Sequence, residues 1–159
     1  MTFLQLESEH SKIPSMKKVI TWLIIIIISV SACDIEQSNI GELEGLWQLY
    51  RTDTIATGGS ADLRESQLSW AFQGELLEMK SHPLSRLDFV ARYTITSDSL
   101  FVEDLRVLDR EKGDPLPDNL EDVKCFGINT PNEHFRLLFF NKEQMRLQSE
   151  TLIIYLRKY

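Results

Sequence analysis

The stretch "RLDFVARYTIT", residues 86–96, decides the fold class of this chain, because apolar side chains occupy every second position along it. Successive side chains of a β-strand point to opposite faces of the sheet. The period of two therefore predicts a strand with one buried face rather than a helix, whose apolar residues recur every three or four positions. The residues expected on the buried face are Leu87, Phe89, Ala91, Tyr93 and Ile95.

The same alternation recurs along the chain and predicts seven further strands, joined by short polar turns. One of them is "LFVEDLRVL", residues 100–108, whose alternation slips midway and so predicts a β-bulge. The other six predicted strands are residues 45–53, 67–73, 76–81, 133–140, 144–150 and 152–159.

Two segments between these strands lack the alternation. Residues 54–66, "TIATGGSADLRES", contain a glycine pair and are predicted to be a loop. Residues 118–127, "DNLEDVKCFG", predict one short helix, in which Asp118 caps the start, Glu121 completes a capping box and Gly127 ends the helix.

Eight antiparallel strands that follow one another through short turns predict an all-β fold, an up-and-down barrel without exposed edges. The alternative is an open sandwich of two sheets. An eight-stranded barrel is either filled by its own side chains or holds one small ligand. The residues expected to face the interior are Leu49, Trp70, Phe72, Leu77, Met79, Phe89, Ala91, Tyr93, Phe135, Leu137, Phe139, Met145 and Leu147, with Tyr93 and Ser149 as the polar ones.

The segment before the predicted barrel has the features of a leader. Val19–Ala32 is an almost wholly apolar run of 14 residues, shorter than the roughly 20 that cross a membrane. Lys17 and Lys18 supply the positive flank. The run ends in "VSAC", which resembles the lipobox of bacterial lipoproteins, in which the cysteine, here Cys33, takes the lipid.

These patterns divide the chain into four parts. We interpret Met16 as the true start, since residues 1–15 are polar, acidic and contain a proline; the alternative is an extended leader. Residues 16–32 are the predicted lipoprotein signal peptide, and residues 33–42 are a polar tether. Residues 43–159 are the predicted barrel domain.

The net charge and the spacing of reactive residues argue against several classes of function. Residues 33–159 contain 14 Lys and Arg against 22 Asp and Glu, and an acidic domain of this kind repels nucleic-acid backbones. Cys125 and His134 are the one candidate pair for nucleophilic catalysis, but no glycine-rich turn accompanies them. No metal-ligand spacing is present. We therefore expect neither an enzyme nor a cofactor, and the sequence sets no oligomeric state.

Several motifs together suggest a family. "GLW" at residues 45–47, at the start of the first predicted strand, resembles the Gly-x-Trp signature of lipocalins. In that family the tryptophan closes one end of the barrel and packs against a basic residue of the last strand. The resemblance implies this role for Trp47, with Arg157 as its preferred partner because guanidinium stacks well on rings, and Lys158 as the alternative.

Residues 33–159 as a whole are similar to the lipocalin-like lipoproteins of Gram-negative bacteria, above all those of the Bacteroidetes. The stretches that carry the similarity are "LEGLWQL", "LSWAF", "GINTPNEHFR" and "LRKY". The resemblance implies a protein of the bacterial cell envelope that is attached through the lipid on Cys33 to the outer membrane and faces the periplasm or the cell surface. It would bind or carry a small hydrophobic molecule. The alternative is an envelope interaction module, with a filled barrel whose loops bind a protein or glycan.

Overall fold

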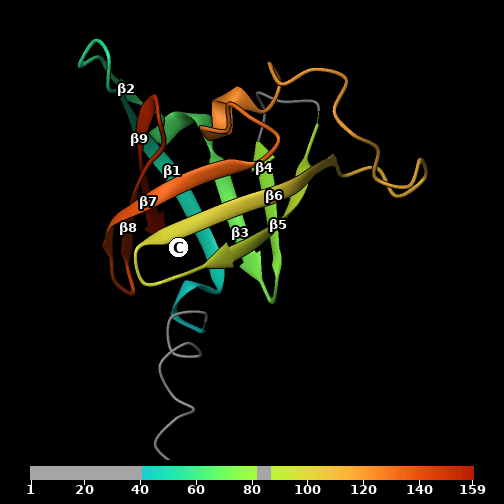
Figure 1. Ribbon diagram of the computed structural model, residues 1–159, viewed down its shortest axis with the longest axis horizontal. Coiled ribbons are helices and arrows are strands. Elements are labelled where there is room, and N and C mark those ends of the chain that lie inside the picture. The colour runs from blue at the N-terminus through green and yellow to red at the C-terminus, as the bar shows by residue number, and fades with distance from the viewer. Residues whose placement is uncertain (1–40, 82–86) are drawn as a thin grey trace, which may run out of the picture. The chain divides into compact units, whose positions relative to one another are not determined.

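The computed structural model describes residues 41–81 and 87–159, and within them nine strands form one antiparallel sheet (Figure 1). The leader, Cys33 and most of the tether lie outside the described residues. In the described part of the chain, no helix is both long and apolar enough to cross a membrane. The strands are β1 (Gly45–Thr54), β2 (Ser60–Asp62), β3 (Leu68–Gln73), β4 (Leu76–Ser81), β5 (Phe89–Ile95), β6 (Ser99–Val107), β7 (Glu133–Phe140), β8 (Gln144–Gln148) and β9 (Leu152–Lys158).

Eight of these strands form a closed barrel, which confirms the predicted fold class. From β3 to β9 each strand pairs with the next one along the chain, and β1 pairs with both β3 and β9. The β1–β9 ladder runs from Trp47 opposite Lys158 to Thr54 opposite Leu152 and closes the ring. Closure gives every strand of the ring two neighbours and leaves no exposed edge.

The ninth strand, β2, was not predicted, since residues 54–66 were expected to be a loop. It pairs with the second half of β1, from Arg51 opposite Asp62 to Asp53 opposite Ser60, and projects beyond the ring in Figure 1. All three residues of β2 are exposed, so the strand has no buried face. The alternation that reveals a half-buried strand is therefore missing from this segment.

Three bulges interrupt the ladders of the described strands, and one of them, which was not predicted, leaves Tyr50 of β1 without a place opposite β9. The slip expected in residues 100–108 is present in β6, where Glu103 pairs with Arg92 but Arg106 pairs with Val90. The bulge in β7 was also not predicted, and it leaves Leu138 without a place in the ladder. The prediction that Phe139 faces the interior is wrong for this reason: its side chain is 43% exposed, and the neighbouring Phe140 packs against the core instead.

The predicted helix is reduced to one 3₁₀ turn, η2 (Lys124–Phe126); a similar turn, η1 (Arg64–Ser66), precedes β3. The expected ending at Gly127 is confirmed, with φ of 84°. The expected cap is wrong, because Asn119 rather than Asp118 accepts the hydrogen bond from the Glu121 N–H, at 2.9 Å. A ten-residue helix is marginal on its own, and here burial of Phe126 fixes a single turn.

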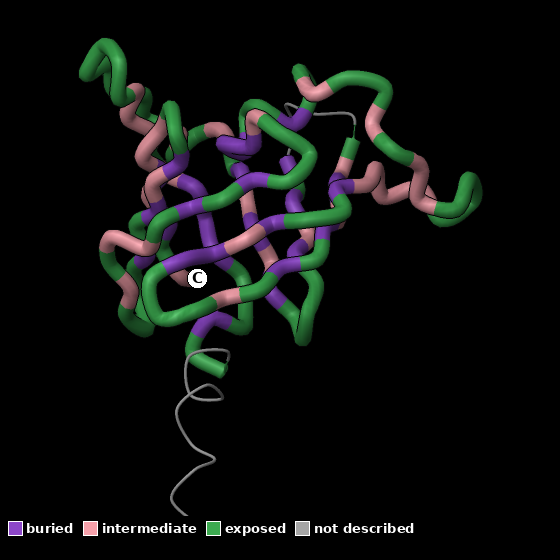
Figure 2. The backbone as a smooth tube through the Cα atoms, in the orientation of Figure 1, coloured by how far each residue is buried: buried purple, intermediate pink, exposed green. Residues whose placement is uncertain are grey.

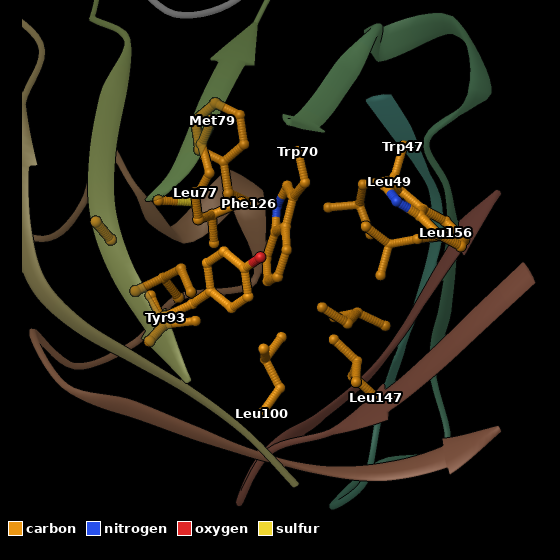
Figure 3. Packing of buried hydrophobic residues seen from close by; sticks show 14 of the residues in the cluster. Trp47, Leu49, Trp70, Leu77, Met79, Tyr93, Leu100, Phe126, Leu147 and Leu156 are labelled. Atoms are coloured by element: carbon orange, nitrogen blue, oxygen red, sulfur yellow. The ribbon is translucent and has the colours of Figure 1, made fainter. Parts of the chain in front are cut away.

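Buried residues alternate with exposed ones along the strands, and the buried side chains meet inside the ring (Figures 2 and 3). In Figure 1, η2 lies at the opposite end of the barrel from the helical residues 41–43 that precede β1. Leu43 and Phe126, one from each of these segments, are fully buried. The core comprises Leu43, Trp47, Leu49, Leu68, Trp70, Phe72, Leu77, Met79, Phe89, Ala91, Tyr93, Leu100, Val102, Leu105, Val123, Phe126, Ile128, Phe135, Met145, Leu147, Ile154 and Leu156.

Candidate functional site

Trp47 lies at the end of the barrel where β1 begins and is fully buried. Its indole Nε1–H donates a hydrogen bond of 2.7 Å to the carbonyl oxygen of Leu43. The Nζ of Lys158 lies 5.2 Å from the centre of the Trp47 ring and donates to the carbonyl oxygen of Glu42, at 2.8 Å. Trp47 and Lys158 thus hold the segment before β1 against this end of the barrel.

The partner of Trp47 is Lys158, and the preference for Arg157 is wrong. Arg157 pairs across the ladder with Gln48, and its Nε donates to the Gln48 Oε1 at 2.8 Å. The guanidinium carbon of Arg157 lies 6.0 Å from the Tyr50 ring rather than over the indole. Strand alternation contained the signal for this arrangement: Leu156 faces inward, so Lys158 shares its face and Arg157 does not.

The residues expected to line the interior are mostly in the core. Leu137 is only partly buried and packs against the core from its rim. Ser149, expected to be an inward polar group, is buried at the turn after β8, where its Oγ accepts a hydrogen bond of 3.1 Å from the Leu152 N–H. The fully or almost fully buried ones are Leu49, Trp70, Phe72, Leu77, Met79, Phe89, Ala91, Tyr93, Phe135, Met145 and Leu147.

Two polar atoms inside the barrel have no hydrogen-bond partner among the described residues: the Nε1 of Trp70 and the hydroxyl of Tyr93. Trp70 is fully buried and Tyr93 is 6% exposed. Both rings contact Phe72, with centroid distances of 6.0 Å and 5.0 Å. Figure 3 shows the Tyr93 hydroxyl directed into the cluster on the side of Trp70.

Other buried polar side chains of the domain do have partners. The Nε2 of Gln48 donates to the Arg64 carbonyl oxygen at 2.9 Å. The carboxylate of Glu133 accepts hydrogen bonds from the backbone N–H groups of Asn129 and Thr130, at 2.8 and 3.2 Å. Buried polar groups are nearly always paired in this way. The unpaired Trp70 and Tyr93 donors are therefore the feature of the interior that packing alone does not explain.

The pKa of Tyr93 is raised, first by burial and then by the negative charges of Glu44 and Glu75. The phenol therefore keeps its proton at neutral pH. An indole N–H is a donor only, and a protonated phenol can also donate. The two groups together offer a site for a hydrogen-bond acceptor.

Three hollows formed by described residues are open to solvent. They have volumes of about 260, 490 and 290 Å³. The first lies beside the β5–β6 bulge and is lined by three arginines: Arg106 and Arg110 are paired with Asp104 and Asp114, each at 2.8 Å, and Arg92 is paired with Glu75 at 3.3 Å. Since these charges are already neutralised locally, the hollow has no free cation for an anionic ligand.

Cys125 and His134 have different hydrogen-bond partners, Cys125 the carbonyl oxygen of Asp122 and His134 the hydroxyl of Ser99. Cys125 lies in η2 and is exposed, and its Sγ lies 3.5 Å from the carbonyl oxygen of Asp122. Partial burial of the sulfur raises the pKa of the thiol, which disfavours the reactive thiolate. His134 stacks on Phe101, with ring centres 4.6 Å apart. Within the described ranges, no three His, Cys, Asp or Glu side chains are grouped to hold a metal ion.

A cluster of charged and aromatic side chains on the outside of β1, β8 and β9 was not predicted. Arg51 and Arg146 place their guanidinium carbons 4.9 and 5.2 Å from the Tyr155 ring centre. The Tyr155 hydroxyl donates to Asp53 at 2.7 Å, and Arg51 forms an ion pair with Asp53 at 2.8 Å. Strand alternation places Arg51 and Asp53 on one face, but only the barrel's register brings Tyr155 beside them.

Replacing Asp53 with Asn should weaken the domain at neutral pH and flatten its response to acid. Hydrogen bonds from Arg51, and then from Tyr155, lower the pKa of Asp53 from 3.8 to about 2. A carboxylate whose pKa is lowered by folding stabilises the protein above its unfolded pKa and loses that contribution as pH falls through the folded pKa. Urea unfolding between pH 7 and pH 2 should show the wild type losing more stability than Asp53→Asn below about pH 4.

The exposed Asp118 supplies the control for this experiment. The Asp118→Asn protein should follow the wild-type acid profile. Parallel acid profiles for Asp53→Asn and the wild type would contradict the assigned role of Asp53.

A closed ring of eight antiparallel strands around an apolar interior, with a buried tryptophan at the end where the first strand begins, defines a lipocalin-like β-barrel protein. The chain belongs to the lipocalin-like domain family, whose model matches residues 26–159. The resemblance seen in the sequence is thereby confirmed at the level of family and fold.

Two solved structures from Bacteroides species are similar. One is a lipocalin-like protein from Bacteroides uniformis, with 21% identity, 75% of this chain and all of that chain covered, and a TM-score of 0.56. The other is an uncharacterized protein from Bacteroides eggerthii, with 20% identity, coverage of 73% and 98%, and a TM-score of 0.53. At these identities the similarity shows a shared fold. A search of curated proteins found no match.

Proposed function

We propose that this chain is a lipid-anchored lipocalin-like protein of the bacterial cell envelope that binds a small, mostly apolar molecule inside its barrel. The observation that carries the proposal is the pair of buried donors on Trp70 and Tyr93, which have no partner among the described residues. Leaving a buried donor unpaired costs about 1–3 kcal/mol. A bound molecule with an acceptor removes this cost and buries its own apolar part against the surrounding core.

The apolar character of the ligand follows from the side chains around the donors. Trp70 contacts Phe72 and Phe135, and Tyr93 contacts Phe72. Ligand sites of this kind are mostly apolar, with few polar groups that orient the ligand. Two donors in an aromatic setting match that description.

A titration with N-phenyl-1-naphthylamine, a neutral apolar dye that brightens in apolar surroundings, tests binding directly. The purified protein should bind it saturably at about one molecule per chain, since an eight-stranded barrel holds at most one small ligand. The same titration in denaturing urea is the control. A linear, non-saturating response equal to that of the unfolded chain would contradict the proposal.

The anchor is proposed from the leader pattern and is tested by replacing Cys33 with Ala. The substituted protein should move almost completely from the membrane fraction to the soluble envelope fraction, because a lipid chain supplies the membrane affinity. Cys125→Ala is a matched control, since it removes the other cysteine of the chain and should leave the protein with the membranes. Unchanged fractionation of Cys33→Ala would refute the anchor.

The second candidate is an envelope interaction module whose barrel is filled. It is favoured by the three hollows, which are open to solvent, and by the cluster around Tyr155 on the outside of the ring. On this alternative the dye would not bind, and the outer surface would recognise a protein or glycan. The dye titration therefore separates the two candidates.

A further inference from the structure

We infer that Trp70 and Tyr93 form the polar end of the ligand site, and that the molecule bound there is uncharged and carries a carbonyl or ether oxygen on an apolar body. The inference rests on the proposed function and specifies the chemistry of its ligand. The structural basis is the pair of unpaired donors on Trp70 and Tyr93, which lie close together within a cluster of apolar side chains (Figure 3). Glu133, the buried charged side chain of the described residues, is already bonded to backbone N–H groups.

The two donors reach this region from different strands. Trp70 lies on β3, opposite Trp47 on β1 and Met79 on β4. Tyr93 lies on β5, opposite Val102 on β6. Phe72, two residues after Trp70, contacts both rings and links the two donors across the interior. Such convergence is what a ligand oxygen with two lone pairs requires.

The aromatic contacts of Trp70 and Tyr93 do not take the place of a hydrogen-bond acceptor for their N–H and O–H groups. The Trp70 and Phe135 rings meet edge to face at 5.8 Å, as do Phe72 and Tyr93 at 5.0 Å, and contacts of N–H or O–H with a ring face are weak. A single buried water would have these two groups as partners, the lower limit for an ordered water. An oxygen atom of a ligand satisfies both donors and brings apolar surface with it.

The charge of the ligand follows from the groups near Tyr93. Glu44 and Glu75 lie close enough for their negative charges to act on its hydroxyl. The cations of this region already have partners, since Arg92 is paired with Glu75 at 3.3 Å and Lys158 contacts Trp47 and bonds to the Glu42 carbonyl. A carboxylate ligand would meet repulsion without a compensating cation, whereas a ketone, ester or ether would not.

The test uses three naphthalenes of similar size. These probes are 2-acetylnaphthalene with a neutral carbonyl, 2-ethylnaphthalene without an acceptor, and 2-naphthoate with a negative charge. We expect the acetyl compound to bind the purified protein at least about tenfold more tightly than either of the others. Its binding should also shift the indole N–H resonance of Trp70 in a ¹H–¹⁵N spectrum. Trp47 is an internal reference, since its N–H is already bonded to Leu43.

Tyr93→Phe keeps the ring contacts and removes only the hydroxyl, so it should erase most of the preference for the acetyl compound. Tyr155→Phe is the matched control, because it removes a hydroxyl bonded to Asp53 on the outer face and should leave the preference unchanged. Equal affinity for the acetyl and ethyl compounds, tighter binding of 2-naphthoate, or an unmoved Trp70 resonance would overturn the inference while leaving a barrel ligand in place. Absence of binding by all three probes and by the dye would overturn the proposed function as well.

Discussion

Replacing Trp47 with alanine should lower the free energy of unfolding by about 3–5 kcal/mol, the usual cost of removing a fully buried large aromatic side chain. The side chain fills the end of the barrel, and its indole N–H is bonded to the Leu43 carbonyl at 2.7 Å. Its ring also contacts Phe140, at 6.0 Å, and lies under the Lys158 ammonium. Alanine would leave a cavity, would remove the hydrogen-bond donor of the Leu43 carbonyl and would remove the ring that the Lys158 ammonium contacts.

Urea denaturation of purified protein measures this loss, and Tyr159→Ala provides the control. Tyr159 is the neighbouring aromatic at the end of β9, but its side chain is 71% exposed. Its replacement should change the free energy of unfolding by less than about 0.5 kcal/mol. A loss below about 1 kcal/mol for Trp47→Ala would show that Trp47 does not hold this end of the barrel.

Replacing Gly127 with alanine should cost about 2–4 kcal/mol, the second largest effect among these substitutions. Gly127 has φ of 84° at the end of η2, a conformation that is strained for residues with a side chain. An added Cβ would also lie 2.9 Å from the Cγ2 of Ile154, a fully buried residue of β9. The backbone and the core would both have to adjust.

Gly113→Ala separates these two causes. Gly113 has a similar φ of 75°, but an added Cβ there would meet no atom within 4 Å. The Gly113 substitution should therefore show only the conformational part of the cost, about 1–2 kcal/mol. The same urea denaturation measures both losses of unfolding free energy. Equal losses at the two positions would show that the Ile154 side chain moves aside without loss of stability and that η2 is not tightly packed on the barrel.

The class of the fold could be predicted because each strand of the ring buries one face and exposes the other. Tyr93 and its neighbours at every second position carry that signal locally. The signal fails where structure depends on pairing between distant residues. The bulge at Leu138 reverses the faces of Phe139 and Phe140, and β2 has no buried face at all.

In the candidate site, too, some features follow from the sequence of one strand and others depend on how distant strands pair. The interior position of Trp70 and Tyr93 follows from alternation, but the absence of a hydrogen-bond partner for each depends on every strand around the barrel. Alternation along β9 already favours Lys158 over Arg157 as the basic partner of Trp47, but the β1–β9 register that places the two opposite each other depends on distant strands. The cluster around Tyr155 also forms only when the first and last strands meet.

The most direct test of the central claim, that the barrel holds a small molecule, is native mass spectrometry of the protein purified from its host. The proposed function predicts a second species heavier than the protein by the mass of one small molecule. Its abundance should fall in Tyr93→Phe and persist in Tyr155→Phe. Extraction with organic solvent should release a neutral compound that is mostly apolar and contains a carbonyl or ether oxygen. A single mass equal to that of the protein with its own lipid modification, repeated across independent preparations, would contradict the claim and favour a filled barrel.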